Sequence, residues 1–285
     1  MVALIPPAFL NTVVALGNPS QDGNTSYNAT GFIYGYHTGN SDEEGKKLYR
    51  LFLVTNRHVF QRAYEHGKVL HARFNKLMES GSNTYTVNFE DANWIVHPNP
   101  EADVAVMPVN SNRLRADGIE FQCFQGNDHV LTLEQARESE ISEGDGIFVL
   151  GFPLGQAGEE RNYAIVRQGI IARAQDWLKG NSQTFLIDAS IFPGNSGGPV
   201  LTKPDSIAIQ GTKANHRCGL IGMVSSYLPY QEVAVSQQTG RPRMIFEENS
   251  GLGVVVPHDV IQEAVLAAVQ ELIPAPQTNS GPEVN

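Results

Sequence analysis

Cysteine is scarce in this sequence, which excludes a disulfide-stapled scaffold. The 285 residues include two cysteines, Cys123 and Cys218, and these can form at most one internal disulfide. Two free, half-buried thiols are the simpler interpretation, because nothing in the sequence brings the two residues together. Unpaired cysteines are typical of proteins in a reducing compartment, so we expect a cytoplasmic location.

Basic residues are also few. The chain has 20 Lys and Arg against 30 Asp and Glu, which gives a formal net charge of −10. Phosphate binding needs clustered Lys and Arg, whereas the longest basic cluster here is Lys46-Lys47, so we expect no nucleic-acid partner. The acidity would also repel anionic membrane surfaces.

Long apolar runs are missing from the sequence. None approaches the roughly 18 residues that a membrane-spanning helix needs, so we expect no membrane partner. The apolar N-terminus lacks a basic stretch and contains Pro6 and Pro7, which argues against a signal peptide. No histidine–carboxylate set has the H-E-x-x-H spacing of zinc peptidases, and we expect neither a metal nor another cofactor.

Short stretches rich in Val, Ile, Phe and Tyr recur between clusters of Gly, Asn and Asp, a pattern typical of an all-β protein. The predicted strands are residues 12–16, 30–36, 48–55, 84–89, 104–109, 146–151, 163–174, 184–189, 220–225 and 252–256. Helical spacing appears over residues 132–139 and 257–272; Pro257 opens the second helix and Pro274 follows it.

This pattern divides the chain into two β halves. Residues 10–110 form the first half and residues 144–273 the second, which includes the terminal helix. The polar, acidic residues 111–143 connect them. We expect residues 274–285, which contain Pro, Ser and Gly, to be a disordered tail.

One serine lies among three glycines and two prolines, in residues 193–199 (Pro-Gly-Asn-Ser-Gly-Gly-Pro). Glycine permits backbone conformations that expose a serine hydroxyl and turn successive N–H groups toward one point. Such N–H groups can stabilise the oxyanion of a tetrahedral intermediate. A Gly-rich turn between two strands is the alternative interpretation of this segment alone.

A serine nucleophile needs a general base, and histidine titrates near neutral pH. His58 is the best placed of the eight histidines, because it directly follows the predicted buried strand 51–55. The base in turn needs an acceptor that sets its tautomer. Asp103 meets this need at the start of an apolar run, although an aspartate there could also cap a turn. The order His58, Asp103, Ser196 is that of chymotrypsin, and no Gly-x-Ser-x-Gly elbow surrounds Ser196.

The sequence resembles trypsin-like serine proteases, and among them the bacterial HtrA-like branch. Residues 55–59 (Thr-Asn-Arg-His-Val), 103–106 (Asp-Val-Ala-Val) and 188–200 resemble the branch's histidine, aspartate and serine motifs. Residues 143–155 and 251–257 give supporting matches. The resemblance extends from about Thr12 to Leu272.

The resemblance implies a chymotrypsin-like fold. In that fold two six-stranded antiparallel β-barrels form the active site in the cleft between them, and a C-terminal helix follows. It also implies a serine endopeptidase with Ser196 as nucleophile, His58 as general base and acid, and Asp103 as the orienting carboxylate. The backbone N–H groups of Gly194 and Ser196 would form the oxyanion hole.

Two departures from relatives narrow this expectation. Asn195 stands where trypsin-type zymogens have an aspartate, so activation through an ion pair with a new N-terminus is not expected. The sequence ends soon after its last helix and includes no PDZ domain after the protease. Regulation through a PDZ domain is therefore in doubt, and a separate regulatory protein partner stays open.

A trypsin-type preference for Lys or Arg needs an acid six residues before the nucleophile, where this chain has Ser190. We therefore expect a neutral substrate pocket and cleavage of protein or peptide substrates after small or medium apolar residues such as Val, Ala or Leu. Specificity set by loops, with Ser190 as a packing residue, is the alternative. The expected pocket residues are Ser190, Ile191, Phe192, Val224, Ser225 and Ser226.

Two other functions stay open on the sequence alone. One is an inactive or regulated pseudoprotease that serves as a protein-binding module. The other is a different hydrolase, such as an esterase, because an acyl-enzyme also permits ester turnover. Reaction of Ser196 with a fluorophosphonate separates the binding module from the enzymes.

Overall fold

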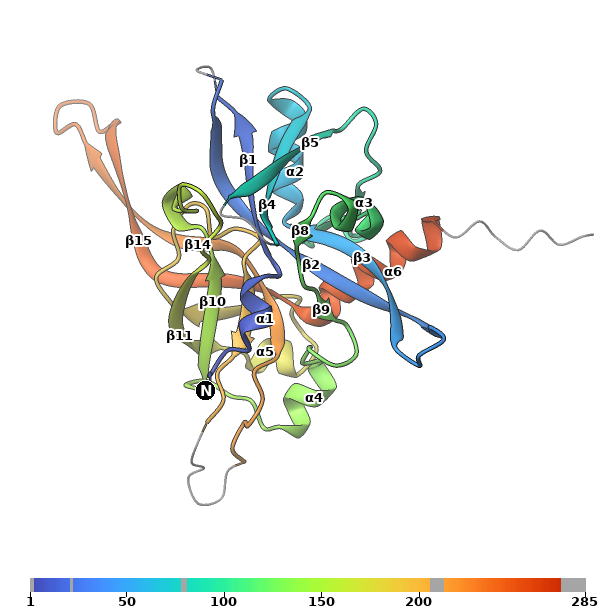
Figure 1. The fold of residues 1–285 in the computed structure, drawn as a ribbon. Helices are drawn as coiled ribbons and strands as arrows, with labels where there is room; N and C mark the ends of the chain where they lie inside the picture. The colour runs from blue at the N-terminus through green and yellow to red at the C-terminus, as the bar shows by residue number, and fades with distance from the viewer. Residues whose placement is uncertain (1–2, 21–22, 78–80, 206–212, 273–285) are drawn as a thin grey trace, which may run out of the picture.

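Strands dominate the chain and form two sheets that follow one another in the sequence (Figure 1). The computed structural model describes residues 3–20, 23–77, 81–205 and 213–272. The predicted disordered tail, residues 274–285, lies outside the described residues.

The first sheet contains nine strands in the order β5-β4-β1-β2-β3-β7-β6, with β8 paired to β4 and β9 paired to β2. The elements of this half are α1 (Pro7–Leu10), β1 (Val13–Pro19), β2 (Thr25–Ser41), β3 (Lys47–Thr55), α2 (Arg57–Glu65), β4 (Val69–Lys76), β5 (Ser82–Asn88), β6 (Ile95–Val96), β7 (Ala105–Pro108), α3 (Ser111–Ala116), β8 (Ile119–Glu120) and β9 (Phe124–Gln125).

The prediction of a six-stranded barrel is wrong for this half, because the sheet stays open. Among the described residues, its terminal strands β5 and β6 do not pair with each other. Aromatic side chains hold the connection between them instead. Phe89, just after β5, lies with its ring centroid 5.5 Å from that of Trp94, just before β6. Both rings also contact Phe60 of α2, with centroid distances of 5.5 and 5.6 Å, so side-chain packing fixes this connection against α2.

The second sheet is the closed six-stranded barrel that the sequence predicted, with the order β10-β11-β12-β15-β14-β13. The elements of this half are α4 (Leu133–Glu138), β10 (Gly146–Gly151), the 3₁₀ turn η1 (Pro153–Gly155), β11 (Ile165–Arg173), α5 (Gln175–Leu178), β12 (Phe185–Asp188), β13 (Pro199–Thr202), β14 (Leu220–Val235), β15 (Pro242–Pro257) and α6 (His258–Leu272). α4 and the C-terminal helix α6 match the two predicted helices.

Three apolar cores hold the molecule together. One lies in the first half and includes Ile33 and Phe60, and a second fills the barrel around Ile187 and Val255. The third joins the two halves, because it contains residues such as Phe32 of β2 together with residues of the barrel and α6. The buried face of α6 consists of His258, Val260, Ile261, Ala264, Val265, Ala268 and Val269. The third core therefore fixes the two halves against each other.

A buried pair of polar side chains, Tyr34 and His258, lies where the two halves of the molecule pack together. His258 is fully buried, and its Nε2 lies 3.0 Å from the hydroxyl oxygen of Tyr34 on β2. The other ring nitrogen, Nδ1, has no hydrogen-bond partner within the described part of the chain. Burial lowers the pKa of His258 to about 3 and raises the pKa of Tyr34, so both side chains are neutral at pH 7.

Because the pKa of His258 is lower in the folded state than its ordinary value of 6.5, only the unfolded state takes up a proton as the pH falls below about 6.5. Stability from this site is complete above pH 6.5 and is lost as the pH falls toward about 3, by up to about 1.4 kcal/mol per pH unit. Urea unfolding over this pH range should show a shallower dependence for His258→Gln, which can still accept the Tyr34 hydrogen bond. Parallel curves for the two proteins would contradict this assignment.

The two cysteines are free thiols, and burial raises the pKa of Cys123 to about 11 and that of Cys218 to about 12. They therefore stay protonated and weakly nucleophilic at neutral pH. Among the described helices, none is long and apolar enough to span a membrane.

Candidate active site

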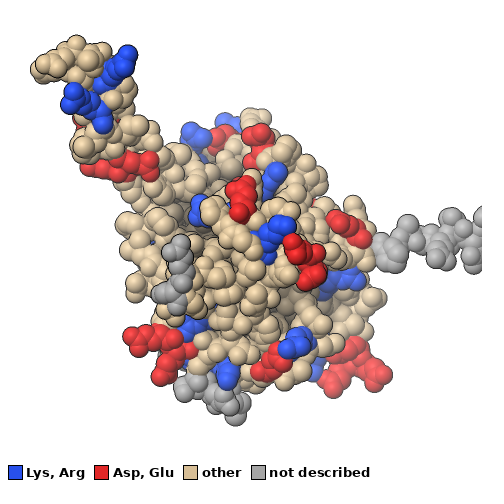
Figure 2. Space-filling model, turned by 90° about the horizontal axis from the view of Figure 1, so that it is seen from above, with Lys and Arg blue, Asp and Glu red and all other residues tan. Residues whose placement is uncertain are grey.

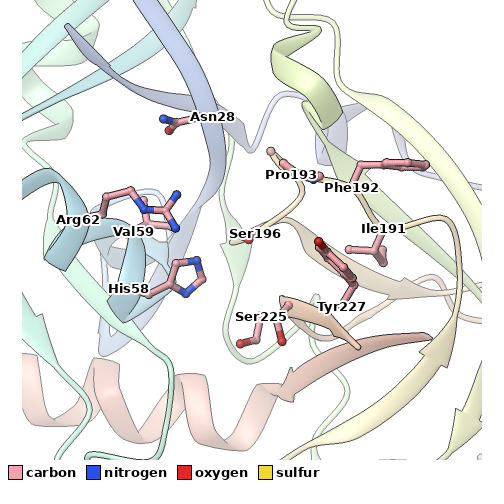
Figure 3. A pocket seen from close by; sticks show the side chains of 12 residues that line it. Asn28, His58, Val59, Arg62, Ile191, Phe192, Pro193, Ser196, Ser225 and Tyr227 are labelled. Carbon is pink, nitrogen blue, oxygen red and sulfur yellow. The ribbon is translucent and has the colours of Figure 1, made fainter. Parts of the chain in front are cut away.

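A cavity of about 340 Å³ receives side chains from both halves of the molecule. The first half contributes Asn28, His58, Val59 and Arg62, and the barrel half contributes Ile191, Phe192, Pro193, Gly194, Ser196, Ser225, Ser226 and Tyr227. Figure 3 shows His58 and Arg62 on one side of this space and Ile191 and Tyr227 on the other, with Ser196 between them.

His58 lies in the first turn of α2, one element later than the strand end at which the sequence placed it. β3 ends at Thr55, and Asn56 is fully buried at the start of the helix. The Asn56 amide donates to the backbone oxygen of Asp103 (3.0 Å), which ties the start of α2 to the segment before β7. The N–H groups of a first helical turn have no partner inside the helix, so they are free to bind an external acceptor.

Asp103 supplies that acceptor and holds the ring as well. Its Oδ1 accepts from the backbone N–H of His58 (3.1 Å), and its Oδ2 lies 2.8 Å from His58 Nδ1. The Ser225 hydroxyl donates to the same Oδ2 (2.6 Å). Together these contacts fix the direction of the imidazole and leave Nε2 free of the carboxylate.

Opposing effects set the charge of Asp103. Burial by itself raises its pKa, but the hydrogen bond and electrostatic attraction of the His58 ring, the Ser225 hydroxyl and the His58 backbone N–H all lower it. The hydrogen bonds prevail, so the pKa of Asp103 lies below its ordinary value and the carboxylate is ionised at neutral pH. An ionised acceptor beside Nδ1 favours the tautomer that carries its proton on Nδ1.

The loop that carries Ser196 needs glycine at two positions. Gly194 has φ +100° and Gly197 has φ +83°, conformations that side chains with a Cβ rarely adopt. A Cβ on Gly197 would also lie 1.9 Å from the backbone oxygen of Thr30 on β2. The loop therefore approaches β2 too closely for any other residue at position 197.

Two residues of this loop that line the cavity, Gly194 and Ser196, have backbone N–H groups without a protein acceptor among the described residues. The Pro193 carbonyl accepts from the N–H of Leu154 in η1 (2.7 Å), and a planar trans peptide directs the following Gly194 N–H the opposite way. Within the described part of the chain, neither the Gly194 nor the Ser196 N–H donates to another protein group. Both are thus available to a ligand.

Thr30 positions the nucleophile loop, a role that sequence reasoning missed. It is fully buried in β2, its N–H donates to the Ser196 carbonyl (2.8 Å), and its hydroxyl donates to the Gly194 carbonyl (2.6 Å). The same hydroxyl accepts from the N–H of Phe152 (3.1 Å). In the sequence, the one sign of this role is a Thr directly before the apolar stretch of β2, residues 31–36.

The structure separates the six residues that the sequence assigned to the substrate pocket. Ile191, Phe192, Ser225 and Ser226 line the cavity. Ser190 is exposed and Val224 is fully buried in the barrel core, and neither is among the lining residues. Ala189 and Ile191 are buried on either side of Ser190, whereas Ser190 itself is exposed just beyond the end of β12.

His58 and Ser196 line the same cavity, but no hydrogen bond joins their side chains within the described residues. Among those residues, no group of three or more His, Cys, Asp and Glu side chains is placed to hold a metal ion. The arrangement thus offers an oriented imidazole, a serine hydroxyl and two free N–H groups around one space.

No curated protein sequence matches the chain. Two solved structures of Rv3671c, both inactive forms, are similar in structure. An alanine mutant of the M. tuberculosis protein has 15% identity over 94% of this chain and 91% of that chain, with a TM-score of 0.42. The Rv3671c protease has 16% identity over 91% and 90%, with a TM-score of 0.43. Residues 29–206 match the trypsin-like peptidase domain, and the chain therefore belongs to that family.

Proposed function

We propose that the protein is a serine endopeptidase in which Ser196, His58 and Asp103 form the catalytic triad. The contact of both Asp103 carboxylate oxygens with His58 carries this proposal, because it orients an imidazole toward a cavity that also holds Ser196. Membership of the trypsin-like peptidase family supports it and implies protein or peptide substrates.

In the proposed reaction, His58 Nε2 takes the proton of Ser196 while Oγ attacks the scissile carbonyl carbon. The Gly194 and Ser196 N–H groups then hold the oxyanion, a contribution of roughly 3–4 kcal/mol for each donor. His58 gives the proton to the leaving amine, and the peptide C–N bond breaks to leave an acyl-enzyme. A water molecule, deprotonated by His58, attacks that ester and releases the acid and Ser196.

The free enzyme does not need a His58–Ser196 hydrogen bond for this proposal to hold. Such catalytic hydrogen bonds are often long without substrate and shorten in the Michaelis complex. Asp103, by contrast, holds His58 before substrate arrives, through contacts at 2.8 and 3.1 Å. Incubation with a peptide library tests the function directly: the wild-type protein should cleave internal bonds and Ser196→Ala should not.

The same library tests the proposed preference for Val, Ala or Leu before the cleaved bond. No Asp or Glu lines the described cavity, whose barrel side presents Ile191, Ser226 and Tyr227 to the substrate. A substrate Lys or Arg would lose hydration there without gaining a counter-charge. We expect apolar residues to be preferred over Lys and Arg by at least about tenfold in kcat/KM. A profile dominated by Lys or Arg would refute the preference.

We also propose that the protein belongs to the HtrA-like branch and works in the cytoplasm. Asn195 supports the branch, because its fully buried side chain accepts from the Phe192 N–H (3.1 Å) and has no carboxylate for a zymogen-type ion pair. The two unpaired cysteines support a reducing compartment.

A further inference from the structure

Strands β14 and β15 continue beyond the barrel as a two-stranded arm, residues 228–249. Figures 1 and 2 show this arm standing clear of the rest of the molecule. Its large apolar side chains are exposed: Leu228, Tyr230, Val233, Val235, Met244, Ile245 and Phe246. An isolated two-stranded ribbon is marginally stable in water, and a cluster of exposed apolar side chains marks an interaction surface.

One edge of the arm is free for further pairing. β15 pairs with β14 along its length, whereas its other neighbour, β12, pairs only with residues 252–255. Within the described part of the chain, residues 242–248 therefore have no strand on their outer edge. An unpaired edge that carries apolar side chains is a template for another strand.

The residues along this edge are complementary to the same residues of a second, antiparallel copy. Residues 243–247 read Arg-Met-Ile-Phe-Glu, with Ile245 at the centre. If a second β15 lies antiparallel with Ile245 opposite Ile245, then Arg243 faces Glu247 of the other copy, and Met244 faces Phe246. Each copy supplies both members, so this register forms two ion pairs and two apolar pairs. Cross-strand pairs of these kinds stabilise a sheet.

The exposure and placement of these residues fit such a contact. Met244 is 56% exposed, Ile245 60% and Phe246 51%, so each has apolar surface to bury. Figure 2 shows basic side chains toward the end of the arm and acidic ones nearer the body, the polarity that an antiparallel pair of arms requires. The corresponding stretch of β14, residues 231–235, has Glu232 but no basic residue, so its edge lacks this complementarity.

We propose that the arm is a homodimerisation element, in which β15 pairs antiparallel with β15 of a second copy about a two-fold axis at Ile245. The two arms form a continuous four-stranded sheet with the order β14-β15-β15-β14. One residue of the proposed interface is connected to the cavity. Glu247 accepts a hydrogen bond from the hydroxyl of Tyr227 (3.0 Å), and Tyr227 lines the cavity.

Sedimentation of the full chain over a range of concentrations, at low and moderate salt, tests the proposal. Wild type should dimerise. Arg243→Glu and Glu247→Arg should each weaken the dimer by about 30-fold, because each change replaces two attractive pairs by two repulsive ones. The double variant Arg243→Glu/Glu247→Arg should recover most of the affinity, since both pairs re-form with reversed polarity.

Arg241→Glu is the matched control. It makes the same charge change on the same arm, but in this register it faces Asn249 of the other copy, so we expect a change below about threefold. Far-ultraviolet circular dichroism of each variant checks that the arm and barrel stay folded. A wild-type protein that remains monomeric, or a double variant as weak as the single ones, would overturn the proposal.

Discussion

Ser196→Ala is expected to lower kcat for peptide hydrolysis by about 10⁶-fold, the scale on which loss of a serine nucleophile acts. The variant keeps both loop N–H groups and His58, but it has no oxygen that can form the acyl-enzyme. Because the side chain lies at the cavity surface and Thr30 holds the loop through backbone oxygens, the free energy of unfolding should change little.

The matched control is Ser41→Ala, which removes an exposed serine hydroxyl at the end of β2. Its kcat and KM should equal those of wild type. Cleavage by Ser196→Ala at more than about one-thousandth of the wild-type rate would assign the hydrolysis to another group.

Asp103→Asn should lower kcat by about 10⁴-fold with little change in KM, as measured with the same peptide substrates. The contacts of Asp103 explain the size of this effect. The backbone N–H of His58 requires an oxygen at the Oδ1 position, so the amide NH₂ must take the Oδ2 position, 2.8 Å from His58 Nδ1. Facing a donor, Nδ1 becomes an acceptor and the ring proton moves to Nε2, which can then no longer take the proton of Ser196.

Asp117→Asn serves as the control. Like Asp103, Asp117 accepts hydrogen bonds from a nitrogen-bearing side chain and a hydroxyl, here the Arg113 guanidinium (2.7 Å) and the Tyr85 hydroxyl (2.8 Å). Asp117 does not line the cavity. This variant should keep the wild-type kcat. An Asp103→Asn protein within about tenfold of wild type would show that the carboxylate does not set the tautomer of His58.

The sequence predicted most of the strands whose apolar side chains face a core, although it missed β13, which is buried along its whole length. β10 matches its predicted bounds, and α6 begins one residue after the predicted start. β4 was missed because a charged residue interrupts its pattern: Arg73 is buried there, with its guanidinium donating to the backbone oxygens of Gly158 and Glu159. Such long-range satisfaction of a buried charge has no local sequence signal.

The helix that carries His58 was also missed, although its signal was present. Val59, Phe60 and Ala63 are the buried residues of α2, and their spacing is helical. The arm was missed for a different reason. Its residues 228–249 face no core, so no burial pattern marks them as strands.

At the site, local motifs indicated the residue types but not every contact. Asp103 and His58 are brought together by segments 45 residues apart, and Ser225 joins them from 122 residues further on. Ser225 was expected in the substrate pocket, and it also donates to Asp103. Ser190 was placed in that pocket by its offset from Ser196 alone, and the structure exposes it.

The most direct measurement of the central proposal is fluorophosphonate labelling followed by mass spectrometry of the labelled peptide. An activated Ser196 predicts one covalent adduct per chain on that residue, lost in Ser196→Ala, strongly slowed in Asp103→Asn and unchanged in Ser41→Ala. An inactive binding module predicts no adduct. Absence of labelling in the wild-type protein, or an adduct on any other residue, would contradict the proposed serine endopeptidase.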